Sequence, residues 1–356
     1  MFSTPAEIVA ARKELEIHYA DFEENDRGGN GYLWFAKNRV SLAEVAIKFY
    51  AGEVGDRRHN EPRLLSAISS PNVLPVHEAR TISEDWGYFI TPRCDGGDLD
   101  DFIATRPSAH QAIDVALGIS TGVSVLHAGG MVHRDLKPGN IVMDGGVPRI
   151  ADFGSVRLLA NGEAETTASQ HSALYRPPES FATNRYSRRG DIYQVGLVTY
   201  QLLGGAIHYN GTRYLSSRER KQYDAIQDNV ERSLIVDAAI RRNAEAGSLI
   251  DVSSLPPWVT KSAKRVLRAM TSPLLSERMS SIAEVASGLS RLRIAIRDWR
   301  LDGAVARLVT PMKVIELHPT TGGYYEAFQK KTGMLRRIPG WEPSTLGDLV
   351  ARCDGV

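Results

Sequence analysis

The chain has little cysteine, almost no net charge and no apolar run long enough to cross a bilayer. Cys94 and Cys353 are its two cysteines, far apart and without a CxxC pair, which argues against a disulfide framework or a zinc site and suits a reducing, cytoplasmic compartment. The formal charge of +1 argues against a chain built to bind polyanions. The apolar stretch 192–207 contains two glutamines and is shorter than the ~20 residues of a membrane span, so it predicts a buried core helix.

The first third of the chain has mixed patterns. Hydrophobic residues make up 42% of the sequence and charged residues 24%, as in ordinary globular proteins. Ile8, Ala11, Leu15 and Tyr19 recur at helical spacing, so residues 1–25 are expected to be irregular or to form one helix. A glycine-rich turn then precedes extended segments at 32–36 and 44–50.

Helical patterns dominate the middle of the chain. Ser108 is a plausible N-cap for a long helix that contains Ile113, Leu117 and Leu126 and ends at two glycines. Similar patterns continue to about residue 300. The chain therefore begins β-rich and becomes α-rich, which suggests two lobes.

After residue 300 the pattern returns to short extended segments between turns. Two or three strands are expected between 313 and 337, and Ser344 would cap a final helix. We treat 301–356 as a small α/β appendage of unknown role. Its basic and aromatic residues would suit a nucleic-acid surface, but strand residues that alternate with turn lysines are typical of any solvated sheet. A docking or autoregulatory module is therefore preferred, and nucleic-acid binding is not expected.

Three short motifs carry chemistry. Residues 133–140 read HRDLKPGN, residues 152–154 read DFG, and residues 45–48 read VAIK. A DFG alone often arises by chance, but the three motifs in this order and spacing are hard to reach by accident. They resemble the catalytic loop, the magnesium motif and the third-strand motif of the eukaryotic-like serine/threonine protein kinases.

The resemblance covers about residues 25–295 and implies an α+β fold with two lobes. After an N-terminal segment at 1–25, a kinase domain would occupy 26–297, with a β-rich N-lobe at 26–93 and an α-helical C-lobe at 94–297. The implied activity is ATP-dependent protein serine/threonine phosphorylation, with ATP and Mg²⁺ as cofactors and proteins with Ser or Thr acceptors as partners.

Five residues receive direct roles in phosphoryl transfer from the resemblance. Asp135 would accept or orient the acceptor hydroxyl, and Lys137 would neutralise charge on the γ-phosphate. Asn140 and Asp152 would bind magnesium. Lys48 would hold the α- and β-phosphates.

The segment 91–99 resembles the hinge between the lobes and implies an adenosine site. Ala46 and Val142 would enclose the adenine ring. The Pro92 carbonyl and the Cys94 amide would face the edge of the ring, because proline keeps its carbonyl although it lacks a backbone donor. Asp98 would reach the ribose.

The glycine-rich loop departs from the family pattern. Gly29 and Gly31 match the first two glycines of G-x-G-x-x-G, whereas Trp34 occupies the third position. The change puts nucleotide affinity in doubt.

Two glutamates are candidates for the ion-pair partner of Lys48. Glu61 has the family spacing and is preferred, but Pro62 follows it and is tolerated only in a first helical turn. Glu53 is the alternative.

The loop before residues 177–179 resembles an activation segment. Thr166, Thr167 and Ser169 are candidate phosphorylation sites, with Arg134 available to clamp a phosphate; a polar loop that needs no modification is the alternative. Glu179 is expected to pair with Arg278 in a structural role.

Three functions remain open at this stage. Lys137, two residues after Asp135, favours an active serine/threonine kinase, because tyrosine kinases usually carry Ala-Ala-Arg after the Asp-Leu. A pseudokinase that acts as a nucleotide-binding scaffold is the main alternative, suggested by Trp34 and Pro62. A small-molecule kinase of the antibiotic-phosphorylating type usually lacks the Leu-Lys-Pro and Pro-Glu motifs that this chain contains.

Overall fold

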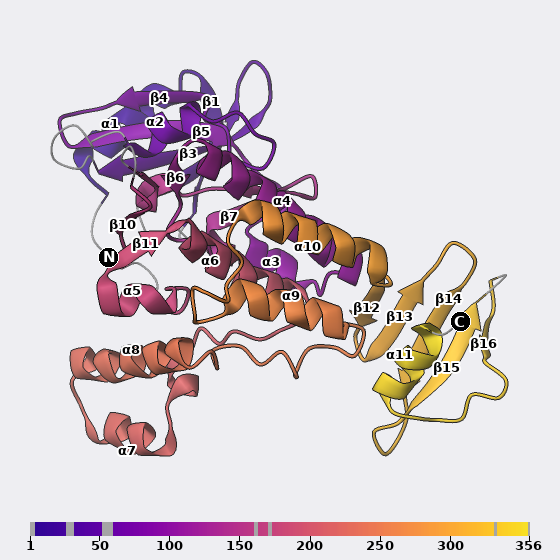
Figure 1. Cartoon of the computed structure of the whole chain (residues 1–356). Coiled ribbons are helices and arrows are strands. Elements are labelled where there is room, and N and C mark those ends of the chain that lie inside the picture. The colour runs from indigo at the N-terminus through magenta and orange to yellow at the C-terminus, as the bar shows by residue number, and fades with distance from the viewer. Residues whose placement is uncertain are drawn as a thin grey trace.

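The computed structural model describes residues 4–25, 32–51, 60–159, 163–169, 173–330 and 333–354. Its elements form an N-terminal sheet, a helical middle and a C-terminal sheet, in that order along the chain (Figure 1). This α+β architecture of a β-rich lobe followed by an α-helical lobe confirms the predicted fold class.

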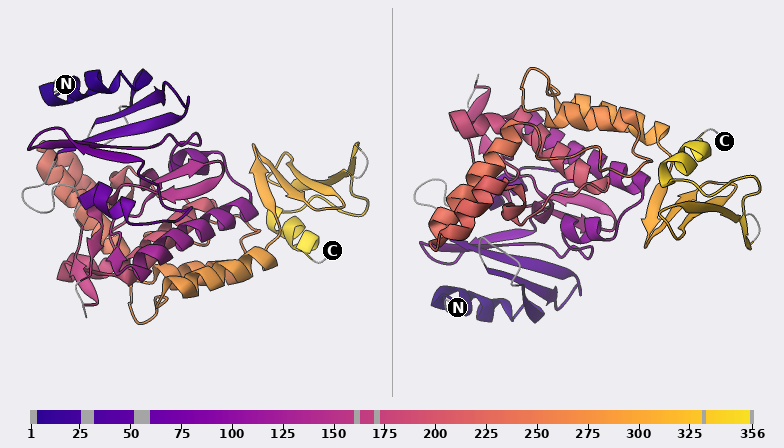
Figure 2. Two further views of the ribbon diagram at one scale, coloured as in Figure 1. Left: turned by 90° about the horizontal axis from the view of Figure 1, so that it is seen from above. Right: turned by 90° about the horizontal axis from the view of Figure 1, so that it is seen from below.

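The N-terminal sheet is antiparallel with the strand order β1-β2-β3-β5-β4. Its strands are β1 (Tyr19–Asn25), β2 (Tyr32–Asn38), β3 (Glu44–Ala51), β4 (Glu78–Thr81) and β5 (Trp86–Pro92). Helix α1 (Ala6–Leu15) lies on the side of this sheet away from the helical lobe (Figure 2). It buries Ile8, Ala11 and Leu15, as the helical spacing predicts, in a core shared with the sheet.

The prediction that residues up to about 25 are irregular or helical is wrong for the last part of that segment. Residues 19–25 form β1, which pairs with β2 from Tyr19 to Asn25. The sequence YADFEEN lacks the apolar alternation of a half-buried strand. Its pairing is irregular between Ala20 and Glu23, so strand pairing with β2, rather than local preference, gives this segment its structure.

The helical lobe is built around α4 and α6. Helix α4 (Ala109–Ala128) begins at Ser108 with a capping box shared with Gln111, as predicted for this N-cap. Helix α6 (Arg188–Leu202) is buried along most of its length, which explains the apolar stretch in the sequence. The other helices are α2 (Asn60–Ser66), α3 (Leu99–Ala104), α5 (Pro178–Thr183), α7 (Ser217–Ala225), α8 (Asn229–Glu245), α9 (Lys261–Thr271) and α10 (Ile282–Ala295). Among the helices of the described segments, none combines the length and the apolarity that crossing a bilayer requires.

Short strands hold the loops between these helices. They are β6 (Met131–Val132), β7 (Ile141–Asp144), β8 (Val147–Ile150), β9 (Arg157–Leu158), β10 (Glu165–Thr167) and β11 (Arg185–Ser187). Strand β6 pairs with β9, β7 with β8, and β10 with β11. The motif residues 133–140 lie between β6 and β7, and 152–154 lie between β8 and β9. The β6–β9 and β7–β8 pairings therefore bring the two motifs together.

The C-terminal part is a sheet of five antiparallel strands with a helix. The strands are β12 (Trp299–Asp302), β13 (Val305–Val309), β14 (Val314–Pro319), β15 (Tyr325–Lys330) and β16 (Leu335–Arg337), and the helix is α11 (Leu346–Asp354). Three of these strands lie between 313 and 337, as expected, whereas β12 and β13 precede that segment and were not predicted. The predicted cap Ser344 is also wrong by one residue, since the Thr345 hydroxyl accepts the Asp348 N–H at the helix start.

This C-terminal sheet shares a hydrophobic core with the helical lobe. The Trp299 ring stacks on Trp258 with 5.8 Å between ring centroids, and Trp299 is almost fully buried. The Asp298 carboxylate accepts the backbone N–H of His110 at 2.9 Å, at the start of α4. The sheet therefore packs beside α4 and α10 and lies to one side of the lobe (Figure 1).

Candidate active site

Alternate side chains of strand β3 point to the core and to the candidate site. Val45, Ile47 and Phe49 are buried in the core beneath α1. Successive side chains of a strand point to opposite faces, so Ala46 and Lys48 point to the face away from α1. Both side chains are only partly buried.

Lys48 forms the centre of a charged cluster. Its Nζ lies 2.8 Å from Glu61 Oε1 and 3.5 Å from Asp152 Oδ1. Burial opposes the charge on Lys48, but the carboxylates of Glu61 and Asp152 outweigh it, so the pKa of Lys48 is raised and the side chain stays cationic. Pro62 lies in the first turn of α2, where proline is tolerated. The structure thus places Glu61 beside Lys48, while Glu53 lies outside the described residues.

The DFG segment turns sharply at its first residue. Asp152 has a left-handed backbone conformation with φ 54° and ψ 77°, and its Oδ1 accepts the Gly154 N–H at 3.4 Å. The Phe153 N–H donates to Glu61 Oε1 at 3.3 Å, and its buried ring packs edge-on against His133. Burial favours the neutral form of Asp152, but the charge of Lys48 reverses this effect, so the pKa of Asp152 is lowered and the carboxylate is anionic.

The catalytic-loop motif brings three predicted residues into direct contact. The Lys137 ammonium donates to Asp135 Oδ2 at 2.9 Å. The Asn140 amide nitrogen donates to the same oxygen at 3.0 Å and to the Asp135 backbone carbonyl at 2.8 Å. Asp135 is therefore held in one orientation by two neighbours, as a group that must be aimed at a reacting atom requires.

A buried carboxylate supports this loop from below. Asp191, at the start of α6, accepts the backbone N–H groups of His133 and Arg134, each at 3.0 Å. It also lies 2.8 Å from His127 Nε2 and accepts the Tyr186 hydroxyl at 2.8 Å. Burial would raise the pKa of Asp191, but the bonds from His127 and the two N–H groups prevail and lower it.

The residues predicted for the adenosine lie at two places where extended segments pair. Ala46 is paired with Thr91 between β3 and β5, next to the Val45–Pro92 pair, and Asp98 is bridged to Val142 of β7. The five predicted residues Ala46, Pro92, Cys94, Asp98 and Val142 are all incompletely buried, whereas neighbours in the same strands are buried. Asp98 already accepts the Asp101 N–H as the N-cap of α3, so one of its oxygens is engaged.

The register of β2 determines the face of the sheet on which the Trp34 side chain lies. Its ring is buried and meets Phe49 edge-on at 5.0 Å, so it faces the core and leaves the site face free. Leu33 pairs with Lys48, and Phe35 pairs with Ala46, on the site face. Leu33 and Phe35 were not predicted as site residues. Alternation along a strand that buries Trp34 and Ala36 on one face would have placed Leu33 and Phe35 on the other face. Gly29 and Gly31 lie outside the described residues.

The activation segment is held by backbone contacts. Thr166 and Thr167 lie in β10, which pairs with β11, and Arg134 donates to the carbonyl oxygens of Ser155 and Thr167. Burial and the nearby Arg157 lower the pKa of Arg134 to about 10. The predicted phosphate-clamping guanidinium thus lies beside the candidate threonines, but it already binds two carbonyl groups.

The predicted structural ion pair is present at the end of this segment. Arg278 donates from Nη1 and Nη2 to the two oxygens of Glu179, each at 2.8 Å. The Arg278 side chain is fully buried, and its Nε also donates to the Ser272 carbonyl. This bidentate pair fixes the segment after residues 177–179 against the rest of the helical lobe.

The donor set near Asp152 fits magnesium shared with a phosphate group. Within the described ranges, no cluster of three His, Cys, Asp or Glu side chains could bind a metal by itself. Mg²⁺ typically takes one or two protein ligands, with phosphate oxygens and waters completing its shell. The Asp152 carboxylate is anionic, and Asn140 uses its amide nitrogen on Asp135, which leaves its amide oxygen for a cation.

Comparison with known proteins agrees with this geometry. The model of the protein kinase domain matches residues 22–287. Among curated proteins, the chain is 29% identical over 203 residues to the serine/threonine-protein kinase drp72 of Corynebacterium efficiens, covering 53% of this chain and 39% of that protein. It is 30% identical over 210 residues to the serine/threonine-protein kinase ATG1a of Arabidopsis thaliana, covering 55% of this chain and 33% of that protein.

A third relative matches this chain over most of the length of both proteins. The mitogen-activated protein kinase HOG1 of Ustilaginoidea virens is 27% identical over 285 residues, which is 76% of this chain and 75% of that protein. The matched part is a third to two fifths of the length of the two relatives named before it. Since the family model covers most of the sequence, and the Lys48–Glu61–Asp152 and Asp135–Lys137–Asn140 contacts lie within it, the chain belongs to the protein kinase family.

Proposed function

We propose that this chain is an ATP-dependent protein serine/threonine kinase. The observation that carries the proposal is the joint presence of two assembled groups, Lys48–Glu61–Asp152 and Asp135–Lys137–Asn140, in one protein kinase domain. A chain that had lost catalysis would be under no requirement to keep both groups in contact.

Lys48 and the residues predicted for the adenosine would hold the nucleotide. Lys48 stays cationic and is oriented by Glu61, so it can bind the α- and β-phosphates without reorganising. Asp152 and Asn140 would hold Mg²⁺, which protein kinases generally use with ATP. When bound, the ion neutralises charge on the β- and γ-phosphates.

Asp135 would act on the acceptor. Its carboxylate is held by Lys137 and Asn140 and can accept a hydrogen bond from a serine or threonine hydroxyl, and so orient the attacking oxygen. Lys137 is close enough to Asp135 to place its positive charge beside the γ-phosphoryl group as that group passes from ADP to the acceptor oxygen. The printed names of relatives include serine/threonine kinases, which supports the same acceptor class here.

The domain limits and partners belong to this proposal. The kinase domain would occupy 26–297, with protein substrates as its partners, and the C-terminal sheet would serve as a docking site. The structure adds that β1 and α1 contribute to the same core as the rest of the N-terminal sheet, so the functional unit includes the segment before residue 26.

Autophosphorylation of the activation segment is also proposed. Thr167 is exposed and lies beside Arg134, which makes it the favoured acceptor. Because β10 already pairs with β11 and Arg134 is bound by carbonyl groups, no phosphate is needed to hold Thr166 and Thr167 in these contacts.

The test is incubation of the purified chain with Mg-ATP and a generic protein acceptor, beside an Asp135→Asn variant of identical size. Intact masses and phosphosites would be recorded for both. Phosphate on serine or threonine in the unmutated reaction alone supports the proposal. Nucleotide binding without any phosphate transfer would identify a pseudokinase scaffold instead, and phosphate confined to tyrosine would refute the acceptor class.

A further inference from the structure

A hollow of about 490 Å³ opens beside the catalytic loop. Lys137 and Gly139 line it on the loop side, and Val236, Asp237 and Ile240 of α8 line it on the other side. A second hollow of about 250 Å³ lies further along α8 and shares Val236 and Asp237 with the first. The two hollows adjoin along α8 through these shared residues, and together they are called here the α8 trough.

The near end of the α8 trough carries excess negative charge. Asp100 and Asp237 line it from two different helices. Lys137 is the basic residue of this lining, and its ammonium is already paired with Asp135 at 2.9 Å. Within the described segments, neither Asp100 nor Asp237 is in ion-pair contact with a lysine or arginine. The near end is thus complementary to a cation.

Asp100 is the more firmly oriented of the two carboxylates. Its Oδ1 accepts the Tyr209 hydroxyl at 2.6 Å, which fixes the carboxylate, while Oδ2 faces the space above Gly139. Burial, together with neighbouring carboxylates, raises the pKa of Asp100 despite the bond from Tyr209. A cation docked at this group would therefore relieve a cost that the carboxylate carries in the free protein.

The walls between these charges are apolar. Leu174 and Ile240 are buried, and Val236 is partly buried on α8. Lysine and arginine side chains have long aliphatic stems that pack on such surfaces while the charged head reaches a polar group. The combination of apolar walls with two carboxylates suits these side chains better than it suits an acidic or a short polar one.

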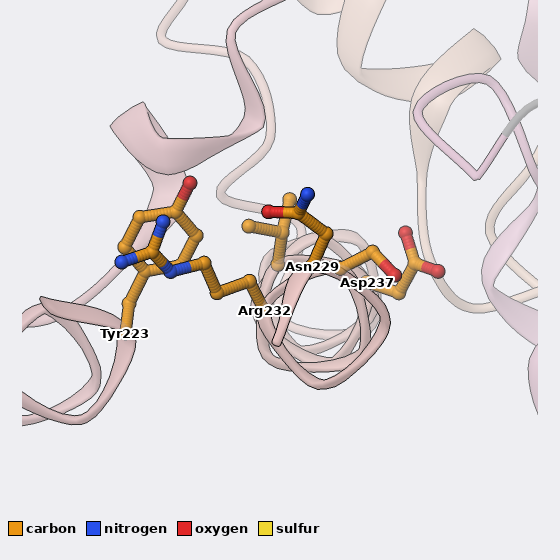
Figure 3. A pocket seen from close by; sticks show the side chains of 6 residues that line it. Tyr223, Asn229, Arg232 and Asp237 are labelled. Carbon is orange, nitrogen blue, oxygen red and sulfur yellow. The ribbon is translucent and has the colours of Figure 1, made fainter. Parts of the chain in front are cut away.

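The far end of the α8 trough has no excess of negative charge, because Arg232 is added there to the shared Asp237. Arg232 lies over the Tyr223 ring at 5.1 Å, and Figure 3 shows it reaching across to that ring while Asp237 extends on the other side of the helix. The Arg232 Nε is buried without a hydrogen-bond partner in the described part of the chain. The excess of negative charge is therefore confined to the end beside the catalytic loop, where Asp100 and Asp237 would accept a basic side chain.

We propose that the α8 trough binds the protein substrate and that Asp100 and Asp237 select a lysine or arginine close in sequence to the phosphorylated residue. This inference rests on the proposed kinase function. It gives α7 and α8, which project from the lower left of Figure 1, a role as a docking element for the substrate chain.

The test is phosphorylation of a peptide library in which each position around a fixed serine or threonine is varied. The wild-type chain would favour Lys or Arg at one or two positions. Asp100→Asn, which keeps an oxygen for Tyr209, would lower kcat/KM for the preferred basic peptide about tenfold, as expected for one charge-assisted hydrogen bond. Asp237→Asn would lower it about threefold, because Asp237 is exposed and such pairs are weaker.

Two further variants complete the test. Glu231→Gln removes the same charge from α8 at a residue outside the trough lining and would leave kcat/KM unchanged for all peptides. Asp237→Lys would shift the preference toward acidic residues at the same position. Wild-type phosphorylation with no basic preference, or an unchanged preference in both Asn variants, would overturn the inference.

A binding measurement separates this inference from the proposed function. If no peptide is phosphorylated by any variant, the kinase proposal fails, and binding to an array of the same peptides then decides the docking role. Retention of basic peptides by the wild-type chain, with weaker retention by Asp100→Asn, would still support the trough. Retention without charge preference would overturn it.

Discussion

Replacement of Asp191 by alanine should be among the most damaging single changes outside the reacting groups. The carboxylate is fully buried and accepts two backbone N–H groups of the catalytic loop. Leaving a buried donor without a partner costs about 1–3 kcal/mol, so the two donors together should cost about 4 kcal/mol of unfolding free energy. The Tyr186 hydroxyl would lose little, because it also bonds Gln194 at 2.9 Å.

Thermal unfolding is the assay for this change. A loss of about 4 kcal/mol should lower Tm by roughly 5 °C in a chain of this size. Asp114→Ala is the matched control, since Asp114 forms an exposed pair with Arg293 and should cost less than about 1 kcal/mol. Phosphotransfer should also fall in the Asp191 variant because Asp135 is no longer held by an anchored loop.

The pH dependence of this loss has a definite direction. The pKa of Asp191 is lowered in the folded chain, so its stabilising contribution is complete above the ordinary carboxyl pKa and disappears as the pH falls through the lowered value. The Tm difference between wild type and variant should therefore be constant from about pH 5 to 8 and shrink below about pH 4. A Tm change of the size of the Asp114 control, or a difference that grows in acid, would refute the reasoning.

Three other changes have distinct expected outcomes. Trp299→Ala should cost about 3–5 kcal/mol of unfolding free energy in calorimetry, because the ring is buried against Trp258; a loss below 1 kcal/mol would show that the C-terminal sheet is not part of the main core. Glu179→Gln should destabilise the chain by about 3 kcal/mol in urea unfolding, because the buried Arg278 guanidinium keeps its charge without a counter-ion, and an unchanged midpoint would contradict this. The double change of residues 166 and 167 to alanine should keep at least about half of the transfer rate, because Arg134 binds a main-chain carbonyl there; abolished transfer would show that phosphate is required.

The motif residues were predictable because each is specified locally. Asp135, Asn140 and Asp152 sit in short segments whose order and spacing are characteristic, and the structure places them near one another with Lys48. Glu61 was harder, because Pro62 argues against a helix unless it lies in the first turn, and that is where the structure has it.

Other features depend on contacts that a sequence does not display. Strand β1 is polar and owes its structure to pairing with β2. The site-facing roles of Leu33 and Phe35 follow from register, which is fixed by the burial of Trp34 on the other face. The α8 trough could not be anticipated either, because Asp100 and Asp237 are distant in sequence and only the fold brings them to the same hollow.

The most direct test of the account compares nucleotide binding with phosphate transfer in the Asp135→Asn variant. Single-turnover transfer to a serine acceptor would be measured at saturating Mg-ATP, together with the nucleotide Kd. If Asp135 orients the acceptor while Lys48 and Asp152 hold the nucleotide, the transfer rate should fall about 10²- to 10⁴-fold and Kd should change less than about threefold. An unchanged transfer rate would contradict the account, since it would place the reacting hydroxyl away from the Asp135–Lys137–Asn140 group.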